Sequence, residues 1–114
     1  LRAGGLIMLE VPNWGSVQRR VFGRRWFHLD LPRHHAHFTA LCLRSYLAEA
    51  GFADIAVGSV TSTVGVTGSL EALSGERSRA WRHNRVLKGA LWPFEALCSL
   101  VGAGGCLAAT ARKP

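Results

Sequence analysis

The stretch LIMLEVPN at residues 6–13 limits how the rest of the chain can be arranged. Its first six residues form an almost unbroken apolar run, which a glycine pair precedes and Pro12 ends. Such a run is typical of a strand that is buried on both faces, as in parallel sheets covered by helices. We therefore predict a strand over 6–11 with neighbours on both sides. The turn that follows it would lie at the carboxyl end of the strand, where ligands bind in open α/β sheets.

Downstream of this strand, the sequence predicts two helices. Ser16 can cap a short helix that ends near Phe22, and Thr39 can cap a clearer helix that runs to about Ala50. Gly51 suits the left-handed backbone position after the second helix.

The second half of the chain predicts strands over 54–64 and 106–111, separated by a helical insertion over 69–100. Within this insertion, Pro93 should kink or split the second helical segment. Because a strand–helix–strand order favours a parallel pair joined by a right-handed crossover, we expect one α/β domain over 1–114.

Residues 23–38, GRRWFHLDLPRHHAHF, form the part of the sequence that burial alone does not explain. This stretch combines three aromatic residues, four histidines, three arginines and an aspartate, with neither the period of a helix nor the alternation of a strand. A loop this rich in titratable and aromatic side chains is a natural place for a functional site.

The composition limits the class of protein and its partners. The chain has 14 basic and 7 acidic residues, and its formal net charge of +7 favours anionic partners. The three cysteines are far apart, which fits reduced thiols better than a zinc or redox motif. The uncharged run 96–111, which no other run exceeds in length, is too short to span a bilayer, so we expect a cytoplasmic chain without a membrane partner.

Several runs, taken in order, resemble class I S-adenosylmethionine-dependent methyltransferases, and in particular a bacterial subgroup that acts on small molecules. They are LRAGGLIMLEVPN at 1–13, FGRRW at 22–26, DLPRH at 30–34, HFT at 37–39, the helix at 43–52 with its AGF ending, and ARKP at 111–114. The chain departs from the subgroup at His35 and Ala36, where an aliphatic and then an aromatic residue are usual.

The resemblance implies the C-terminal half of a Rossmann-like methyltransferase sheet, namely its last three strands with the insertion 69–100 as a helical cap between the final two. The glycine-rich loop and the acidic residue that bind the cofactor in such folds are missing, so S-adenosylmethionine would be bound mainly by residues absent from this chain. The chain also begins at leucine, and we expect a part of a larger enzyme that is inactive alone. That enzyme would transfer a methyl group to a small-molecule acceptor.

The resemblance also implies where the acceptor would bind. His34 and His37 match the subgroup's pattern and are the expected catalytic residues, as a base or as an orienting donor. Asn13 at the strand exit and Trp26 would contact the acceptor, although a turn-stabilising role for Asn13 and a packing role for Trp26 stay open.

Two charged residues of the same stretch are also candidate acceptor-binding residues. Asp30 could fix a histidine tautomer, and Arg33 could neutralise an anionic acceptor or simply hold the loop. The spacing of Asp30 and the histidines is weak evidence for metal binding, and we expect no metal site.

Two other classes of function stay open. Arg19, Arg20, Arg24 and Arg25 surround aromatic residues and are followed by Arg77, Arg79, Arg82 and Arg85. Arginine with stacking aromatics suits RNA, but no recognition motif accompanies it, so nucleic acid is the less favoured partner. A non-catalytic interaction domain derived from a methyltransferase also fits the missing cofactor half.

Overall fold

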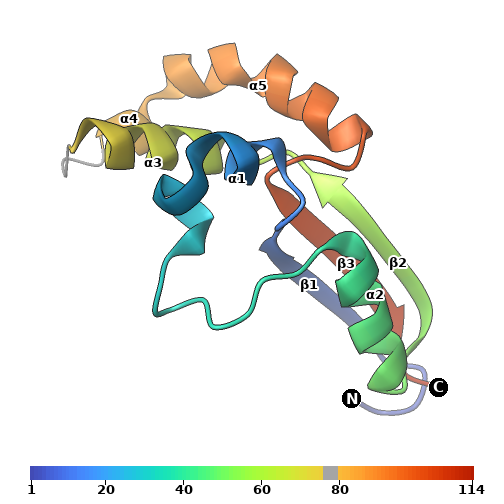
Figure 1. Cartoon of the computed structure of the whole chain (residues 1–114). Helices are drawn as coiled ribbons and strands as arrows, with labels where there is room; N and C mark the ends of the chain where they lie inside the picture. Colours follow the sequence, from blue (N-terminus) through green and yellow to red (C-terminus); the bar gives the residue numbers. More distant parts are fainter. Residues whose placement is uncertain (76–79) are drawn as a thin grey trace.

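The computed structural model describes residues 1–75 and 80–114 as a small α/β domain (Figure 1). In chain order its elements are β1 (Leu6–Pro12), α1 (Val17–Phe22), two short 3-10 turns (Gly23–Arg25 and Phe27–Leu29), α2 (Ala40–Glu49), β2 (Ala53–Val60), α3 (Thr63–Ser74), α4 (Ala80–His83), α5 (Arg85–Leu100) and β3 (Cys106–Arg112). No helix in these ranges is long and apolar enough to cross a membrane.

The three strands form one sheet in the order β1-β3-β2, and β3 pairs antiparallel with both neighbours. Consequently β1 and β2 run in the same direction, as a strand–helix–strand order predicts, but they lie on opposite edges instead of pairing. The α/β class is confirmed, whereas the structure shows an antiparallel sheet and no parallel Rossmann sheet. The pairing puts Leu107 of β3 opposite both Val11 of β1 and Ser59 of β2.

One face of the sheet and helix α2 enclose the hydrophobic core. Leu43 and Leu47 of α2 pack on Leu107, Ala109 and Ala111, all of them buried. Partly buried side chains from both edge strands complete this layer: Ile7, Leu9, Val11, Ile55 and Val57. The small alanines of the central strand leave room for the two leucines of the helix.

The predicted caps of the first two helices are confirmed. The Ser16 hydroxyl accepts a hydrogen bond from the Arg19 amide at 3.1 Å, and the Thr39 hydroxyl accepts one from the Cys42 amide at 3.2 Å. Helix α2 ends as expected, because Gly51 has a φ of +82° and the next amide donates to the Leu47 carbonyl at 3.0 Å.

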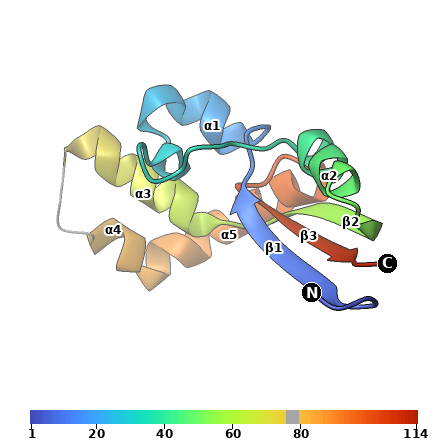
Figure 2. The ribbon, with the colours of Figure 1, turned by 90° about the horizontal axis from the view of Figure 1, so that it is seen from below.

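The prediction that the first strand is buried on both faces is wrong. Met8 is 74% exposed and Leu6 57%, while Ile7 and Leu9 on the other face pack into the core. The reason is topological, because β1 is an edge strand of the sheet. Among the described residues only α2 covers the sheet near β1, and it covers one face (Figure 2).

The predicted boundary between the second strand and the helical insertion is also wrong. We expected a strand to residue 64 and the helical insertion from residue 69, but α3 begins at Thr63. The two glycines in this segment are packing positions and not turn signals, since a Cβ at Gly68 would lie 2.5 Å from the Phe27 ring. Of the two outcomes predicted for Pro93, a kink or a split, the split does not occur, because α5 continues through it from Arg85 to Leu100.

Helices α1, α3 and α5 lie together beyond the carboxyl ends of β1 and β2, away from α2 (Figures 1 and 2). The predicted helical insertion, 69–100, is therefore present as the last part of α3 together with α4 and α5, apart from residues 76–79, which lie outside the described ranges.

The core can be tested at its most buried leucine. Leu107 is fully buried, and replacing it by alanine should lower the free energy of unfolding by about 2–5 kcal/mol, because a cavity remains under α2. Chemical denaturation measures the change. Leu41→Ala, at an exposed position of α2, should change stability by less than about 0.5 kcal/mol. Equal losses in the two variants would show that the core is misplaced.

Candidate functional site

Trp26 is the buried centre of a group of rings that we call the ring cluster: Trp14, Trp26, His28, His34 and His37. Trp26 is only 2% exposed, and its ring centroid lies 6.2 Å from Trp14, 5.7 Å from His28 and 6.1 Å from His37. His37 is also 5.1 Å from Trp14 and 6.3 Å from His34. These tilted and edge-on arrangements are favourable for aromatic rings, and they gather residues from both ends of the stretch 23–38.

The ring cluster lies at the carboxyl end of β1 because the stretch 23–38 leaves α1 and returns to the strand exit. Phe38 forms a parallel bridge with Asn13, and its carbonyl accepts a hydrogen bond from the Trp14 amide at 2.9 Å. The candidate residues are therefore placed where the sequence predicted a crevice.

Asn13 is buried, and all its side-chain hydrogen bonds go to the backbone. Its Nδ2 donates to the Gly104 carbonyl at 2.8 Å and to the Gly102 carbonyl at 3.2 Å, while its Oδ1 accepts from the Gly15 amide at 2.9 Å. Asn13 thus joins the exit of β1 to the loop that enters β3. This geometry corresponds to the turn-stabilising alternative rather than to acceptor binding.

Asp30 and Arg33 pair with each other at the outer side of the stretch. The Arg33 Nη2 lies 2.7 Å from Asp30 Oδ1, and the Arg33 side chain is 81% exposed. No hydrogen bond to a histidine side chain is found for the Asp30 carboxylate within the described ranges. The structure therefore shows no side-chain hydrogen bond by which Asp30 would fix a histidine tautomer, and it places the Arg33 side chain in solvent, paired with Asp30.

His28, which the sequence reasoning did not single out, is the most perturbed histidine. Its Nε2 lies 3.1 Å from the Ser62 hydroxyl and 3.8 Å from the Cys106 sulfur. Burial, with a smaller contribution from nearby His34, lowers the pKa of His28 to about 4, although Asp30 opposes this shift. The imidazole is therefore neutral at pH 7. Its partners lie far away in sequence, so only its place in the histidine-rich stretch could have marked it.

A cavity of about 200 Å³ opens beside the ring cluster at the end of β1, and we call it the histidine crevice. It is lined by Glu10, Val11, Pro12, His28, His34 and Cys106. Burial is also the main cause that raises the pKa of the Cys106 thiol, so this group is uncharged at neutral pH. The crevice can therefore receive an uncharged polar group and offer it imidazole nitrogens.

The two predicted catalytic histidines have different positions. His34 lines the crevice, and its Nδ1 lies 3.0 Å from the His28 carbonyl. His37 does not line the crevice; its Nε2 is buried against the tryptophans without a hydrogen-bond partner within the described ranges.

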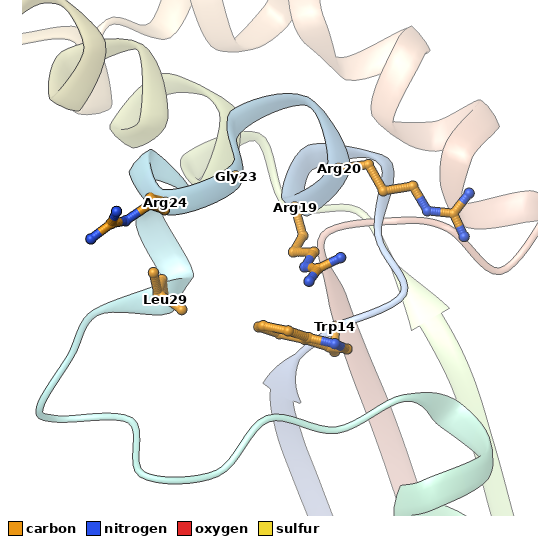
Figure 3. Close-up of a pocket in the computed structure, with 6 residues that line it drawn as sticks. All are labelled: Trp14, Arg19, Arg20, Gly23, Arg24 and Leu29. Atoms are coloured by element: carbon orange, nitrogen blue, oxygen red, sulfur yellow. The ribbon is translucent and has the colours of Figure 1, made fainter.

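A second cavity, of about 310 Å³, opens beside Trp14, and we call it the arginine cavity (Figure 3). It is lined by Trp14, Arg19, Arg20, Gly23, Arg24 and Leu29. The Arg19 guanidinium carbon lies 4.0 Å from the Trp14 ring centroid, whereas Arg20 and Arg24 extend away to opposite sides. With no acidic residue in its lining, this cavity has a positive potential.

Of the arginines that suggested RNA binding, Arg19, Arg20 and Arg24 line the arginine cavity together. Arg77 and Arg79 lie outside the described residues, and Arg82 is engaged with the buried Glu71 carboxylate. Arg25 donates to the Leu73 carbonyl at 3.4 Å.

The glycine loop 102–105 does not fit a nucleotide, and the described residues form no metal cluster. A Cβ on Gly104 would lie 2.6 Å from the Ser59 hydroxyl, and one on Gly105 would lie 2.5 Å from Gln18 Nε2. These glycines therefore pack against protein and cannot cradle a nucleotide. Within 1–75 and 80–114, no group of three or more histidine, cysteine, aspartate or glutamate residues is placed to hold a metal ion.

Comparison of the chain with protein-family models, with curated proteins and with solved structures found no match.

The backbone role of Asn13 predicts a large effect from an isosteric change. Asn13→Asp removes both donors and turns a carboxylate toward two carbonyl oxygens, so the free energy of unfolding should fall by about 3 kcal/mol. Asn84→Asp is the matched control, because the α5 cap needs only an acceptor for the Leu87 amide. Urea denaturation of both variants tests this, and a stable Asn13→Asp protein would contradict the role.

The low pKa of His28 predicts a loss of stability in acid. The unfolded chain takes up a proton on His28 near pH 6.5, but the folded chain does so only near pH 4. The stabilisation is therefore complete above pH 6.5 and is lost as the pH falls toward 4, by about 3 kcal/mol.

Denaturation curves between pH 4 and pH 7.5 measure this loss. The His28→Asn variant should lack this part of the pH dependence, whereas the exposed control His35→Asn should keep it. If the stability of the wild type and of His28→Asn changed with pH in the same way, the low pKa of His28 would be refuted.

Proposed function

We propose that this chain forms the acceptor-binding side of a class I S-adenosylmethionine-dependent methyltransferase that acts on a small molecule. The main support is the sheet order, in which β3 runs antiparallel between two strands that are parallel to each other. The resemblance implies the last three strands of a methyltransferase sheet with helices between the final two, and the structure has three strands in this chain order, with α3, α4 and α5 between β2 and β3. This order agrees with the sequence runs at 1–13, 22–39 and 111–114 that resemble the same family.

The unpaired edge and the uncovered face of β1 support the proposal that a cofactor-binding half lies outside this chain. The strand has a hydrogen-bonded neighbour on one side only, and Leu6 and Met8 on its uncovered face are exposed. Parallel strands of a Rossmann-like sheet, paired beside β1, would explain why this strand is apolar on both faces. Because the glycine loop 102–105 does not fit a nucleotide, the methyl donor would be bound by that half.

The histidine crevice supplies the chemistry on the acceptor side. A carbonyl oxygen can only accept a hydrogen bond, so the contact with the His28 carbonyl requires His34 to carry its hydrogen on Nδ1. This tautomer leaves a lone pair on Nε2, which can accept a proton from an acceptor hydroxyl or amine. His37 packs against Trp14 and Trp26, and it would act by holding the residues that line the histidine crevice in position.

The helices α3, α4 and α5 would cover the bound acceptor. They lie at the same end of the sheet as the crevice, and α3 contributes the glycines against which Phe27 and His28 pack. Such a cover excludes water from the reacting groups.

The proposal is tested with the complete gene product and labelled S-adenosylmethionine. We expect transfer of the label to a small molecule from a metabolite extract. His34→Gln should lower kcat by about 100-fold or more, because a proton acceptor is lost, with the Kd for S-adenosylmethionine unchanged. The exposed His35→Gln is the control and should keep full activity.

Calorimetry with the 114-residue chain alone should show no S-adenosylmethionine binding. If the complete gene product neither bound S-adenosylmethionine nor transferred a methyl group, an interaction domain would be the better interpretation. Salt-sensitive retention of RNA would favour the nucleic-acid alternative.

A further inference from the structure

Helix α5 has apolar residues on two opposite faces. The inner face packs on α3 and β2, with Cys98 and Glu95 buried. The outer face carries Val86, Phe94, Leu97 and Val101 at helical spacing, with Trp92 and Leu100 beside them. These six side chains, which we call the outer stripe, are 50–84% exposed. An apolar surface of this length on a small domain indicates a site of interaction.

The charges near the outer stripe have one sign. In residues 63–75 and 80–101 the two acidic side chains, Glu71 and Glu95, are both buried. The basic residues are accessible by comparison: Arg85 is exposed, and Lys88 is half-buried with its ammonium at the end of a long apolar stem. The helical region therefore presents apolar and cationic groups together, without an exposed carboxylate in those two ranges.

We infer that the outer stripe of α5 docks on an anionic lipid surface, with the helix lying in the plane of the interface. Tryptophan, phenylalanine and leucine enter the boundary between headgroups and acyl chains, and flanking basic residues attract anionic headgroups. A second copy of the chain fits less well, because it would bring the same basic residues and a second net charge of +7 to the contact.

This inference does not depend on the proposed methyl transfer, and it changes the expectation about membranes. The sequence excluded a spanning segment and was taken to exclude a membrane partner. Docking needs only one exposed helix face. The sequence alone does not show which apolar face of α5 is exposed and which is buried, because the apolar residues of both faces have helical spacing.

The inference is tested by co-sedimentation of the 114-residue chain with lipid vesicles. Binding to vesicles of phosphatidylcholine with about 30% phosphatidylglycerol should be at least about tenfold tighter than binding to phosphatidylcholine alone. Arg85→Gln combined with Lys88→Gln should weaken binding to the anionic vesicles by about 10- to 30-fold, and added salt should weaken it as well.

Two further variants separate the stripe from the charge. Phe94→Ser with Leu97→Ser should weaken binding by about tenfold or more, whereas Leu41→Ser with Tyr46→Ser, at exposed positions of α2, should not. Trp92→Phe should still bind but should lose the blue shift of tryptophan emission that vesicles cause in the wild type. Circular dichroism verifies that all variants remain folded.

Equal binding to both vesicle types, no binding, or unchanged binding by the Phe94→Ser/Leu97→Ser variant would overturn the inference. A concentration-dependent dimer that the same substitutions abolish would assign the stripe to self-association instead. Binding of an RNA oligonucleotide, with none to vesicles, would assign the surface to nucleic acid.

Discussion

The buried amide of Asn13 is the interaction on which the rest of the structure depends. Its hydrogen bonds hold the exit of β1 against the loop 102–104 that leads into β3, so the edge strand and the central strand are fixed at the same point. The neighbouring residues extend this point of attachment: Ser16 caps α1, and the Trp14 amide binds the Phe38 carbonyl. Both ends of the histidine-rich stretch are thereby anchored at one corner of the sheet. The ring cluster and its two cavities owe their position to this anchorage.

The two cavities beside the ring cluster have opposite electrostatic character. The histidine crevice holds a neutral imidazole and a protonated thiol, because burial disfavours the charged form of each. The arginine cavity faces solvent and keeps its guanidinium groups, one of them on the Trp14 ring. Trp26, which is 2% exposed, packs against Trp14 of the arginine cavity and against His28 of the histidine crevice. A molecule at this corner of the sheet would therefore meet neutral imidazole and thiol groups beside the Glu10 carboxylate in one cavity, and arginines in the other.

Local features of the fold were predictable from the sequence, and distant ones were not. The caps at Ser16 and Thr39 and the ending at Gly51 depend on neighbouring residues, so they were predicted correctly. The start of α3 was missed because Gly65 and Gly68 serve contacts with a stretch some forty residues away. The position of β3 between the other strands depends on pairing across about a hundred residues, which periodicity cannot reveal.

The candidate site shows the same limit. His34 and His37 were found because they stand out in the sequence, and they do meet at the ring cluster. The pKa of His28 depends on burial that only the fold provides. Asp30 and Arg33 also stand out, but three residues of separation let them pair with each other.

The central position of β3 has a consequence for synthesis of the protein. It is the last of the three strands to leave the ribosome, yet it supplies every hydrogen-bonded partner in the sheet. Within the residues described here, β1 and β2 are joined only through β3, so Leu43 and Leu47 of α2 have no complete sheet to cover until β3 has been made. Formation of the core therefore depends on contacts of high sequence separation, which form slowly.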